Sequence, residues 1–270
     1  MKKTKAVKWT REHLLIAMNL YCKLPFGQLR HGNPVIIEVA KKLGRTPSAL
    51  SMKLCNLASF DPVLQARGIK GLQGAARQDK EIWDEFQANS AELAPMSESL
   101  LHDLLTKNAE DEVSFLQRDR IIIEPARKIS PPTGATEKES TMLVRRGQQF
   151  FRQTILTAYG KRCCISGITV PRLLIASHIV PWSESKKDRL NPRNGLCLSA
   201  LHDAAFDDGL ITLDEDCRVV LSKQLRKYFP QTALEQNFAA YEGRPISKPE
   251  QLAEPDPALL KIHRETIFQN

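Results

Sequence analysis

Three polar residues, His178, Asn194 and His202, restrict the fold of this chain more than any other feature of its sequence. The stretch RLLIASHIVPW is typical of a β-strand that ends near His178, and Asn194 lies in a turn before a second short strand, Leu196–Leu198. The next segment, SALHDAAFDDG, predicts a short helix that carries His202. The separations are 16 and 8 residues, so a strand, a loop, a strand and a helix can bring the three side chains to one point.

Regular elements are expected on both sides of this segment. Residues 142–159 predict an amphipathic helix in which Phe151, Ile155 and Leu156 can pack together. The segments LITLD and RVVLSK, which follow the short helix, predict a β-hairpin. The pattern as a whole predicts an α+β fold, with helices gathered in the N-terminal part.

The first 60 residues predict three helices. Thr10, Asn33 and Thr46 are typical N-cap residues before apolar stretches, and Gly44 ends the second helix. The second and third helices, joined by a short turn, predict a helix-turn-helix. The stretch VAKKLGRTPSALSMKLCNL resembles Myb-like and related helix-turn-helix DNA-binding domains.

The third of these helices has a buried stripe of leucines and an outward-facing side. Ser48 and Ser51 are expected to face outward, with Lys53 near the edge, and Arg45 lies in the turn before them. These four residues are the candidate DNA contacts of this part of the chain. A plain three-helix bundle with no nucleic-acid role is the alternative.

The distribution of charge favours a polyanionic partner. Residues 1–60 carry 11 Lys or Arg and only 2 Glu, residues 61–140 carry 10 basic and 15 acidic residues, and residues 141–235 carry 14 basic and 9 acidic residues. Contacts from Lys and Arg to phosphate release counterions, so two basic segments favour nucleic acid. A solvated basic surface is the alternative.

The chain divides into five predicted parts. Helical patterns at 80–88 and 97–107, with a short strand at 121–123, give the middle of the chain no evident chemistry, and ISPPTGATEKES is typical of a linker. The predicted parts are a helix-turn-helix-like domain at 1–60, a helical spacer at 61–128, a linker at 129–140, a second domain at 141–235 and a C-terminal tail at 236–270.

The segments ASHIVPW and NPRNGLCLSALHDAAFDDGL, with the preceding RRGQQFFRQTILTAYGKRCCISG, resemble the HNH endonuclease family with its ββα-metal core. The variant is similar to that of bacterial restriction-type nucleases, and the resemblance covers residues 142 to about 225. It implies hydrolysis of phosphodiester bonds, with His178 as general base and His202 as metal ligand. By the same resemblance, Asn194 would fix the loop and orient His178.

One position departs from the family pattern. Many HNH nucleases carry Asp, Glu or His immediately before the catalytic histidine as a second metal ligand, whereas this chain has Ser177. Asp203 and Asp207, on the same predicted helix as His202, are the available carboxylates, although neither shares its face. A site completed by water and phosphate oxygens suits Mg²⁺, with Mn²⁺ as a substitute.

Several residues near the HNH-like segment are not expected to take part in the chemical step. Many relatives bind a structural zinc through two Cys-x-x-Cys pairs; this chain has none, so no structural zinc is expected and the cysteines are interpreted as core residues. Trp182 is expected to pack behind the site, and His13, His31, His102 and His263 are interpreted as incidental. The candidate phosphate contacts, for which ordinary solvation is the alternative, are Arg145, Arg152 and Arg193.

The sequence therefore predicts a DNA-cutting enzyme that acts in restriction of foreign DNA. The alternatives are a DNA-binding regulator whose HNH scaffold is inactive, which Ser177 favours, and a toxin-type nuclease. The sequence has no stretch of 18 apolar residues, so no membrane partner is predicted. The cysteine pattern predicts reduced thiols and a cytoplasmic protein. One metal site cuts one strand, so cutting both strands could involve a homodimer, which the sequence leaves open. The catalytic core does not distinguish RNA from DNA.

Overall fold

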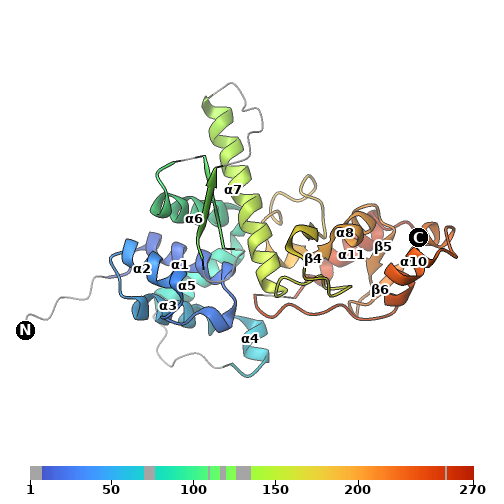
Figure 1. Cartoon of the computed structure of the whole chain (residues 1–270), viewed down its shortest axis with the longest axis horizontal. Coiled ribbons are helices and arrows are strands. Elements are labelled where there is room, and N and C mark those ends of the chain that lie inside the picture. Colours follow the sequence, from blue (N-terminus) through green and yellow to red (C-terminus); the bar gives the residue numbers. More distant parts are fainter. Residues whose placement is uncertain (1–7, 70–76, 109, 116–119, 126–134, 253) are drawn as a thin grey trace, which may run out of the picture. The chain divides into compact units, whose positions relative to one another are not determined.

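The computed structural model describes residues 8–69, 77–108, 110–115, 120–125, 135–252 and 254–270, with only the backbone for 135–140 (Figure 1). The chain forms two compact units. The N-terminal unit contains the residues up to 60 and 69–147, and the C-terminal unit contains residues 61–68 and 148–270. The predicted α+β class is confirmed, because helices dominate the first unit and the second combines β-hairpins with helices.

The three predicted N-terminal helices are present, and their predicted caps are confirmed. The side chains of Thr10, Asn33 and Thr46 accept hydrogen bonds from backbone N–H groups of the first helical turns. Gly44 takes φ +66° after the second helix, a conformation that glycine adopts without steric cost. The helices are α1 (Arg11–Lys23), α2 (Pro34–Lys42) and α3 (Pro47–Ala58).

Two further helices complete the core of the N-terminal unit. Helices α5 (Arg77–Ala88) and α6 (Ser90–Leu105) pack on α1 because their apolar faces, including Trp83 and Leu101, are buried there. The predicted spacer at 61–128 is therefore not a separate part. A small antiparallel hairpin of β1 (Asp111–Ser114) and β2 (Ile122–Pro125) follows, of which only the second strand was predicted.

Residues 61–68 belong to the C-terminal unit instead. Asp61 caps the short helix α4 (Pro62–Ala66), and its second carboxylate oxygen accepts a hydrogen bond of 2.6 Å from the backbone N–H of Leu252. Arg67 donates to the carbonyl of Glu250 at 2.8 Å. These bonds explain why a segment distant in sequence packs with the C-terminal residues.

The prediction that Lys53 lies near an exposed edge is wrong. Its ammonium is buried and forms an ion pair of 2.6 Å with Asp79 of α5, which also accepts a hydrogen bond from Asn56 at 2.8 Å. The ring of Trp9 lies 5.0 Å from the same ammonium. Lys53 therefore stabilises the helix bundle and is not available to a phosphate group.

The other candidate contacts of this unit are partly engaged within it. Ser51 is half-buried and donates to the carbonyl of Leu29 at 2.5 Å, whereas Ser48 is exposed. Arg45 donates to the carbonyl of Lys8 at 2.7 Å, and its guanidinium carbon lies 4.4 Å from the centre of the Trp9 ring.

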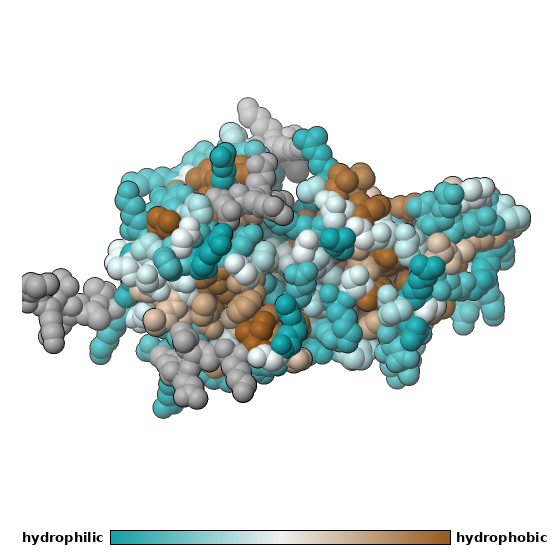
Figure 2. All heavy atoms as spheres, turned by 60° about the horizontal axis from the view of Figure 1, so that its bottom comes forward, coloured by the Kyte–Doolittle hydropathy of each residue, from teal (hydrophilic) through white to brown (hydrophobic). Residues whose placement is uncertain are grey.

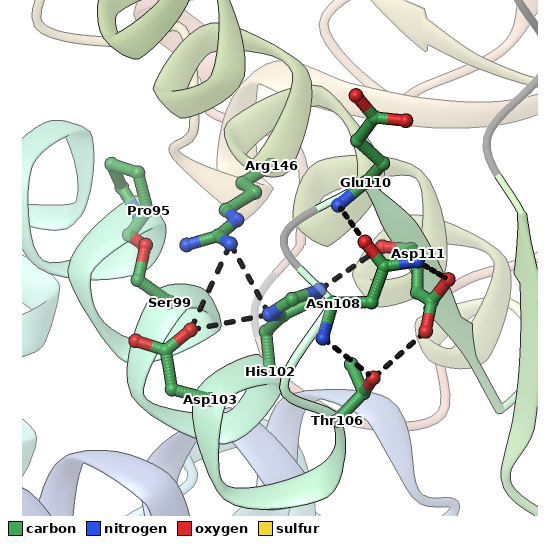
Figure 3. Close-up of polar contacts among 9 residues, drawn as sticks. All are labelled: Pro95, Ser99, His102, Asp103, Thr106, Asn108, Glu110, Asp111 and Arg146. Atoms are coloured by element: carbon green, nitrogen blue, oxygen red, sulfur yellow. Dashed lines mark hydrogen bonds and ion pairs between the residues drawn. The ribbon is translucent and has the colours of Figure 1, made fainter.

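His102, interpreted from the sequence as incidental, joins α6 to neighbouring elements (Figure 3). Its Nε2 lies 3.0 Å from the carbonyl oxygen of Asp111 in β1, and its Nδ1 lies 3.2 Å from both Arg146 and Asp103. Thr106 at the end of α6 donates to the Asp111 carboxylate at 2.7 Å. The cluster holds the β1–β2 hairpin and the adjoining part of α7 against the end of α6.

The helix predicted at 142–159 is longer than expected. Helix α7 runs from Ala135 to Ala158, so the second half of the predicted linker is helical, while residues 129–134 lie outside the described part of the chain. Residues of α7 up to Gly147 pack with the N-terminal unit and those from Gln148 with the C-terminal unit. The expected packing residues Phe151, Ile155 and Leu156 are all buried.

The C-terminal unit is built on two short antiparallel hairpins and several helices. Strand β3 pairs with β4, and α8 follows β4 directly, as the sequence predicted; β5 pairs with β6 in the predicted second hairpin. The elements are η2 (Pro171–Leu173), β3 (Leu174–His178), η3 (Pro192–Asn194), β4 (Gly195–Ser199), α8 (Ala200–Asp207), β5 (Ile211–Leu213), β6 (Val219–Leu221), α9 (Lys223–Arg226), α10 (Thr232–Asn237), η4 (Ala239–Tyr241) and α11 (Pro257–Thr266).

Residues 236–270 are not the tail that the sequence predicted. Phe238 and Leu260 are buried, and α11 packs on β5. The reason is that α11 is amphipathic, with Leu259, Leu260 and His263 on its buried face.

The large apolar side chains that are exposed among the described residues come from many different elements. On the face shown in Figure 2 the apolar residues form small patches among hydrophilic ones. Among the residues that the structure describes, no helix combines the length and the apolar character needed to cross a bilayer.

The Lys53–Asp79 ion pair gives a test of the N-terminal unit. We expect Asp79→Ala to lower the free energy of unfolding by about 3 kcal/mol, because it leaves a buried ammonium without its counter-ion. The double variant Lys53→Met with Asp79→Leu should recover most of that loss. Urea denaturation of the three proteins measures both effects, and equal stability of Asp79→Ala and wild type would contradict the role assigned to the pair.

Candidate functional site

The pairing of β3 with β4 determines where His178 lies. In the antiparallel register, His178 is opposite Gly195. A Cβ on Gly195 would lie 2.4 Å from Cδ1 of Ile155 and 2.8 Å from Cζ of Phe151, so only glycine allows α7 to pack this closely. As a result, the Phe151 ring stacks on the imidazole of His178 at 4.0 Å between centroids and 7° between planes.

A backbone carbonyl fixes the protonation pattern of the His178 ring. Nε2 lies 2.9 Å from the carbonyl oxygen of Arg189. Because a carbonyl oxygen can only accept, Nε2 carries the proton and Nδ1 of the neutral ring keeps its lone pair. Nδ1 has no hydrogen-bond partner among the described residues. Burial lowers the pKa of His178, and the bond to Arg189 only partly opposes that shift. The side chain is thus a neutral base near pH 7.

Asn194 is fully buried and holds the loop that follows β3. Its Nδ2 donates to the carbonyls of Val180 at 3.0 Å and Asp188 at 3.1 Å, and its Oδ1 accepts from the N–H of Val180 at 2.8 Å. The amide therefore joins the beginning of the loop to its end. It contacts the backbone beside His178 and does not touch the imidazole.

His202 is buried in the core of the unit and does not line the pockets that contain His178. Its Nε2 lies 2.8 Å from the carbonyl of Asn237, its Nδ1 lies 2.8 Å from Oγ of Ser199, and the ring is buried. Nε2 donates to the carbonyl, so Nδ1 accepts from the serine hydroxyl and no lone pair is left for a metal. The rings of Phe238 and Tyr241 pack edge-on against it.

The phase of α8 explains this arrangement. Residues one position apart in a helix point about 100° apart, whereas residues four apart share a face. His202 faces the core, so Asp203 and Asp207 share a different face. Both aspartates line a pocket of about 380 Å³, here called the acidic pocket. The residues that line it are Ile175, Ala176, Ser177, His178, Ile179, Pro181, Trp182, Asp203, Asp207, His263 and Ile267.

Burial and mutual repulsion disfavour the charged forms of the two aspartates in the acidic pocket. Burial raises the pKa of Asp203. Burial, together with the charges of Asp203 and Asp208, raises the pKa of Asp207 to about 6. Two carboxylates that repel each other at the edge of a pocket are stabilised by a bound cation.

Ser177 supplies a third oxygen. Its hydroxyl is close enough to Asp203 to lower the pKa of that carboxyl, yet it is buried without a hydrogen bond of acceptable geometry to any described residue. No three His, Cys, Asp or Glu side chains in the described part of the chain are placed to hold a metal ion. The available set is two carboxylates and a hydroxyl, which suits a hard cation that keeps water or phosphate oxygens as its other ligands.

A second pocket, of about 240 Å³, also includes His178. Arg152 lies in its wall and donates to the carbonyl of Leu174 at 2.9 Å, which holds its guanidinium in place. Trp182 was expected to pack behind the site, but it lines both pockets and contacts His178 edge-on at 5.7 Å. The residues of this arginine pocket are Gln148, Phe151, Arg152, Ile175, Ala176, His178 and Trp182.

The other two candidate arginines are partly engaged. Arg193 pairs with Asp256 at 3.3 Å, and Arg145, which belongs to the N-terminal unit, lies 3.9 Å from Glu112. Neither lines the two pockets that contain His178.

Sequence reasoning missed the contribution of α11. His263, interpreted as incidental, lines the acidic pocket and stacks on Phe206 of α8 at 3.8 Å between centroids. No short-range pattern connects it with α8, since the two lie more than 50 residues apart. Only the amphipathic pattern of 257–266 could have indicated that this segment packs. The expectation that Cys163, Cys164 and Cys197 belong to the core is confirmed, because all three are buried.

Comparison with known families identifies the segment that carries this geometry. Residues 163–214 match the family model described as HNH endonuclease. The range contains β3, β4 and α8, whose arrangement is consistent with a ββα HNH core. The match implies nuclease activity on nucleic acid, and HNH nucleases typically use a divalent metal. It assigns no family to the N-terminal helices, and no curated protein matches the chain.

The pKa of His263 gives a test of how the C-terminal unit is held together. Burial is the main cause that lowers this pKa to about 4, from an ordinary value of 6.5. Above pH 6.5 the ring is neutral in both states; between pH 6.5 and 4 only the unfolded chain takes up the proton. Stability is therefore lost as the pH falls, by about 1.4 kcal/mol per pH unit.

The variant His263→Phe lacks this dependence. We expect the difference in unfolding free energy between wild type and His263→Phe to shrink by about 2 kcal/mol from pH 7 to pH 5. Chemical denaturation at the two pH values measures it, with Lys261→Met, at an exposed position of the same helix, as a control whose difference from wild type should not depend on pH. A difference that stays constant for His263→Phe would show that the folded protein accepts the proton freely.

Proposed function

We propose that this protein is a divalent-metal-dependent endonuclease that hydrolyses phosphodiester bonds of DNA, with His178 as the general base. One observation carries the proposal. A histidine whose tautomer is fixed by a backbone carbonyl lies in one pocket with two mutually repelling carboxylates and an unpaired hydroxyl. Hydrolysis of a phosphodiester needs a base for water and positive charge at the phosphate, and this pocket can supply both.

His178 takes the proton from the attacking water at Nδ1. The hydrogen bond from Nε2 to the Arg189 carbonyl strengthens when the ring becomes positive, because the donor is then charged. Stacking on Phe151 and the edge contact with Trp182 hold the ring plane, so the base does not have to be oriented during the reaction. Asn194 supports this geometry through the loop backbone.

Ser177, Asp203 and Asp207 would hold Mg²⁺, with Mn²⁺ as a substitute. When bound, the cation would supply positive charge at the scissile phosphate and at the leaving oxygen. This assignment retains both carboxylates predicted from the sequence and replaces His202, whose ring nitrogens are used in the core. Ser177, at a position where relatives carry a charged ligand, contributes a neutral oxygen.

The preference for DNA depends on the N-terminal unit. Positions 1–60 carry 11 basic and 2 acidic residues. This positive charge, together with the α2–turn–α3 arrangement, fits contact with duplex phosphates. Of the contacts predicted in this unit, Ser48 is exposed, whereas Arg45 and Ser51 are half-buried. In the C-terminal unit, Arg152 offers a fixed positive charge beside His178, suited to a phosphate that flanks the cut bond. Restriction of foreign DNA is the role we assign to such an enzyme.

Loss of the base tests the activity. We expect the native chain to cut duplex DNA with Mg²⁺, and His178→Ala to be slower by about 100-fold or more, since general bases contribute at least that factor. Unmodified and modified duplexes, together with RNA of the same sequence, identify the substrate. If both proteins bind DNA but neither cuts it with Mg²⁺ or Mn²⁺, the chain is a DNA-binding regulator with an inactive scaffold.

A second pair of variants separates the metal ligands from the core. We expect Asp203→Asn to raise the Mg²⁺ concentration for half-maximal cleavage by more than about tenfold, with little loss of stability. His202→Gln should instead lower the free energy of unfolding by about 2 kcal/mol, because buried partners lose their hydrogen bonds, while the Mg²⁺ requirement stays the same. Cleavage at graded Mg²⁺ and urea denaturation measure the two quantities. The reverse pattern would restore His202 as the ligand.

A further inference from the structure

We propose that the C-terminal segment 263–269 is part of the nuclease site, in which His263 is a positioning residue for the carboxylate of Asp207. This inference rests on the proposed function, since it concerns the cation held by Ser177, Asp203 and Asp207. The segment lies outside residues 163–214, the range that matches the HNH family. It was predicted from the sequence to be a tail.

The end of α8 is capped locally, but its place in the unit depends on packing. The backbone N–H groups of Gly209 and Leu210 bind the carbonyls of Phe206 and Ala205, and a short helix is stabilised mainly by tertiary contacts. Helix α8 has eight residues, and Asp207 is its last. The position of the Asp207 carboxylate relative to Asp203 therefore depends on what holds this final turn.

The C-terminal segment supplies such contacts. Nε2 of His263 lies 3.1 Å from the carbonyl of Phe206, the residue before Asp207. Nε2 of Gln269 donates to the carbonyl of Asp208 at 2.7 Å, and its backbone N–H donates to the carbonyl of Gly209 at 2.9 Å. One segment thus binds three backbone carbonyls at and just beyond the end of α8.

The ring of His263 is itself fixed on three sides. Since the Phe206 carbonyl can only accept, Nε2 donates and Nδ1 accepts from Oγ1 of Thr212 in β5 at 2.9 Å. The imidazole also stacks on the Phe206 ring with 15° between planes. His263 therefore couples α8 to β5 and cannot rotate away without losing all three contacts.

Gly209 makes the close approach of this segment possible. Its φ of +65° suits glycine, and a Cβ at this position would lie 2.1 Å from the carbonyl oxygen of Ile267. The side chain of Ile267 then forms a wall of the acidic pocket next to His263. The segment therefore supports α8 and also forms part of the wall of the pocket that the aspartates line.

Direct binding of Mn²⁺ to the full-length protein tests the inference without relying on cleavage. Titration followed by the electron paramagnetic resonance signal of free Mn²⁺ gives the dissociation constant. We expect His263→Phe, which keeps an aromatic ring on Phe206 but loses both hydrogen bonds, to raise it by about tenfold, as supporting partners of metal ligands do. Gln269→Glu, which replaces a donor by an acceptor, should raise it as well.

Arg264→Met is the matched control. Arg264 is on the same helix and donates to a backbone carbonyl at 3.0 Å, but that carbonyl belongs to Leu213 of β5 and not to α8. Its Mn²⁺ affinity should stay within about twofold of wild type. Thermal unfolding of each variant separates a loss of affinity from a loss of fold, and Gln269→Glu decides the question if His263→Phe does not fold.

Asp207→Asn distinguishes two kinds of failure. If this substitution leaves Mn²⁺ binding unchanged, the proposed metal site itself is wrong. If Asp207→Asn weakens binding while His263→Phe and Gln269→Glu behave like Arg264→Met, the metal site stands and the positioning role of the C-terminal segment is overturned.

Discussion

The antiparallel pairing of β3 with β4 is the interaction on which the rest of the site depends. It places His178 opposite Gly195, and the missing side chain of that glycine lets Phe151 of α7 stack on the imidazole. The loop between the strands then returns the carbonyl of Arg189 to Nε2, while Asn194 closes the loop on itself. A single strand pairing thus fixes the position, the plane and the tautomer of this imidazole. A shift of register by one residue would send His178 to the opposite face of the hairpin.

Local rules explain which parts of this arrangement follow from the sequence. N-cap side chains, a glycine after α2 and alternating apolar residues act over a few positions, so α1–α3, β3, β4 and α8 could all be predicted close to their observed bounds. The buried stripe of α3 follows from the same spacing rule. The contacts of Lys53 do not, because its partner Asp79 lies on another helix far along the chain.

The contacts of His202 show the same limit of local rules. A resemblance to HNH nucleases gave His202 as metal ligand, but the phase of α8 turns it to the core, where Ser199 and Asn237 occupy both ring nitrogens. Helical spacing does show that Asp203 and Asp207 share a face, and it also shows that His202 is not on it. What spacing cannot show is which of the two faces meets His178. That is decided by packing against Phe238 and Tyr241 from beyond the matched range.

The two aspartates repel each other on the helix whose end the C-terminal segment contacts. Like charges four residues apart on a helix destabilise it, and here burial adds to the repulsion. A helix of eight residues left to itself would relieve this strain by fraying at its last turn, which would separate Asp207 from Asp203. The hydrogen bonds from His263 and Gln269 to the end of α8 oppose this fraying. The repulsion is then retained in the folded protein, and under the proposed function a bound cation would relieve it.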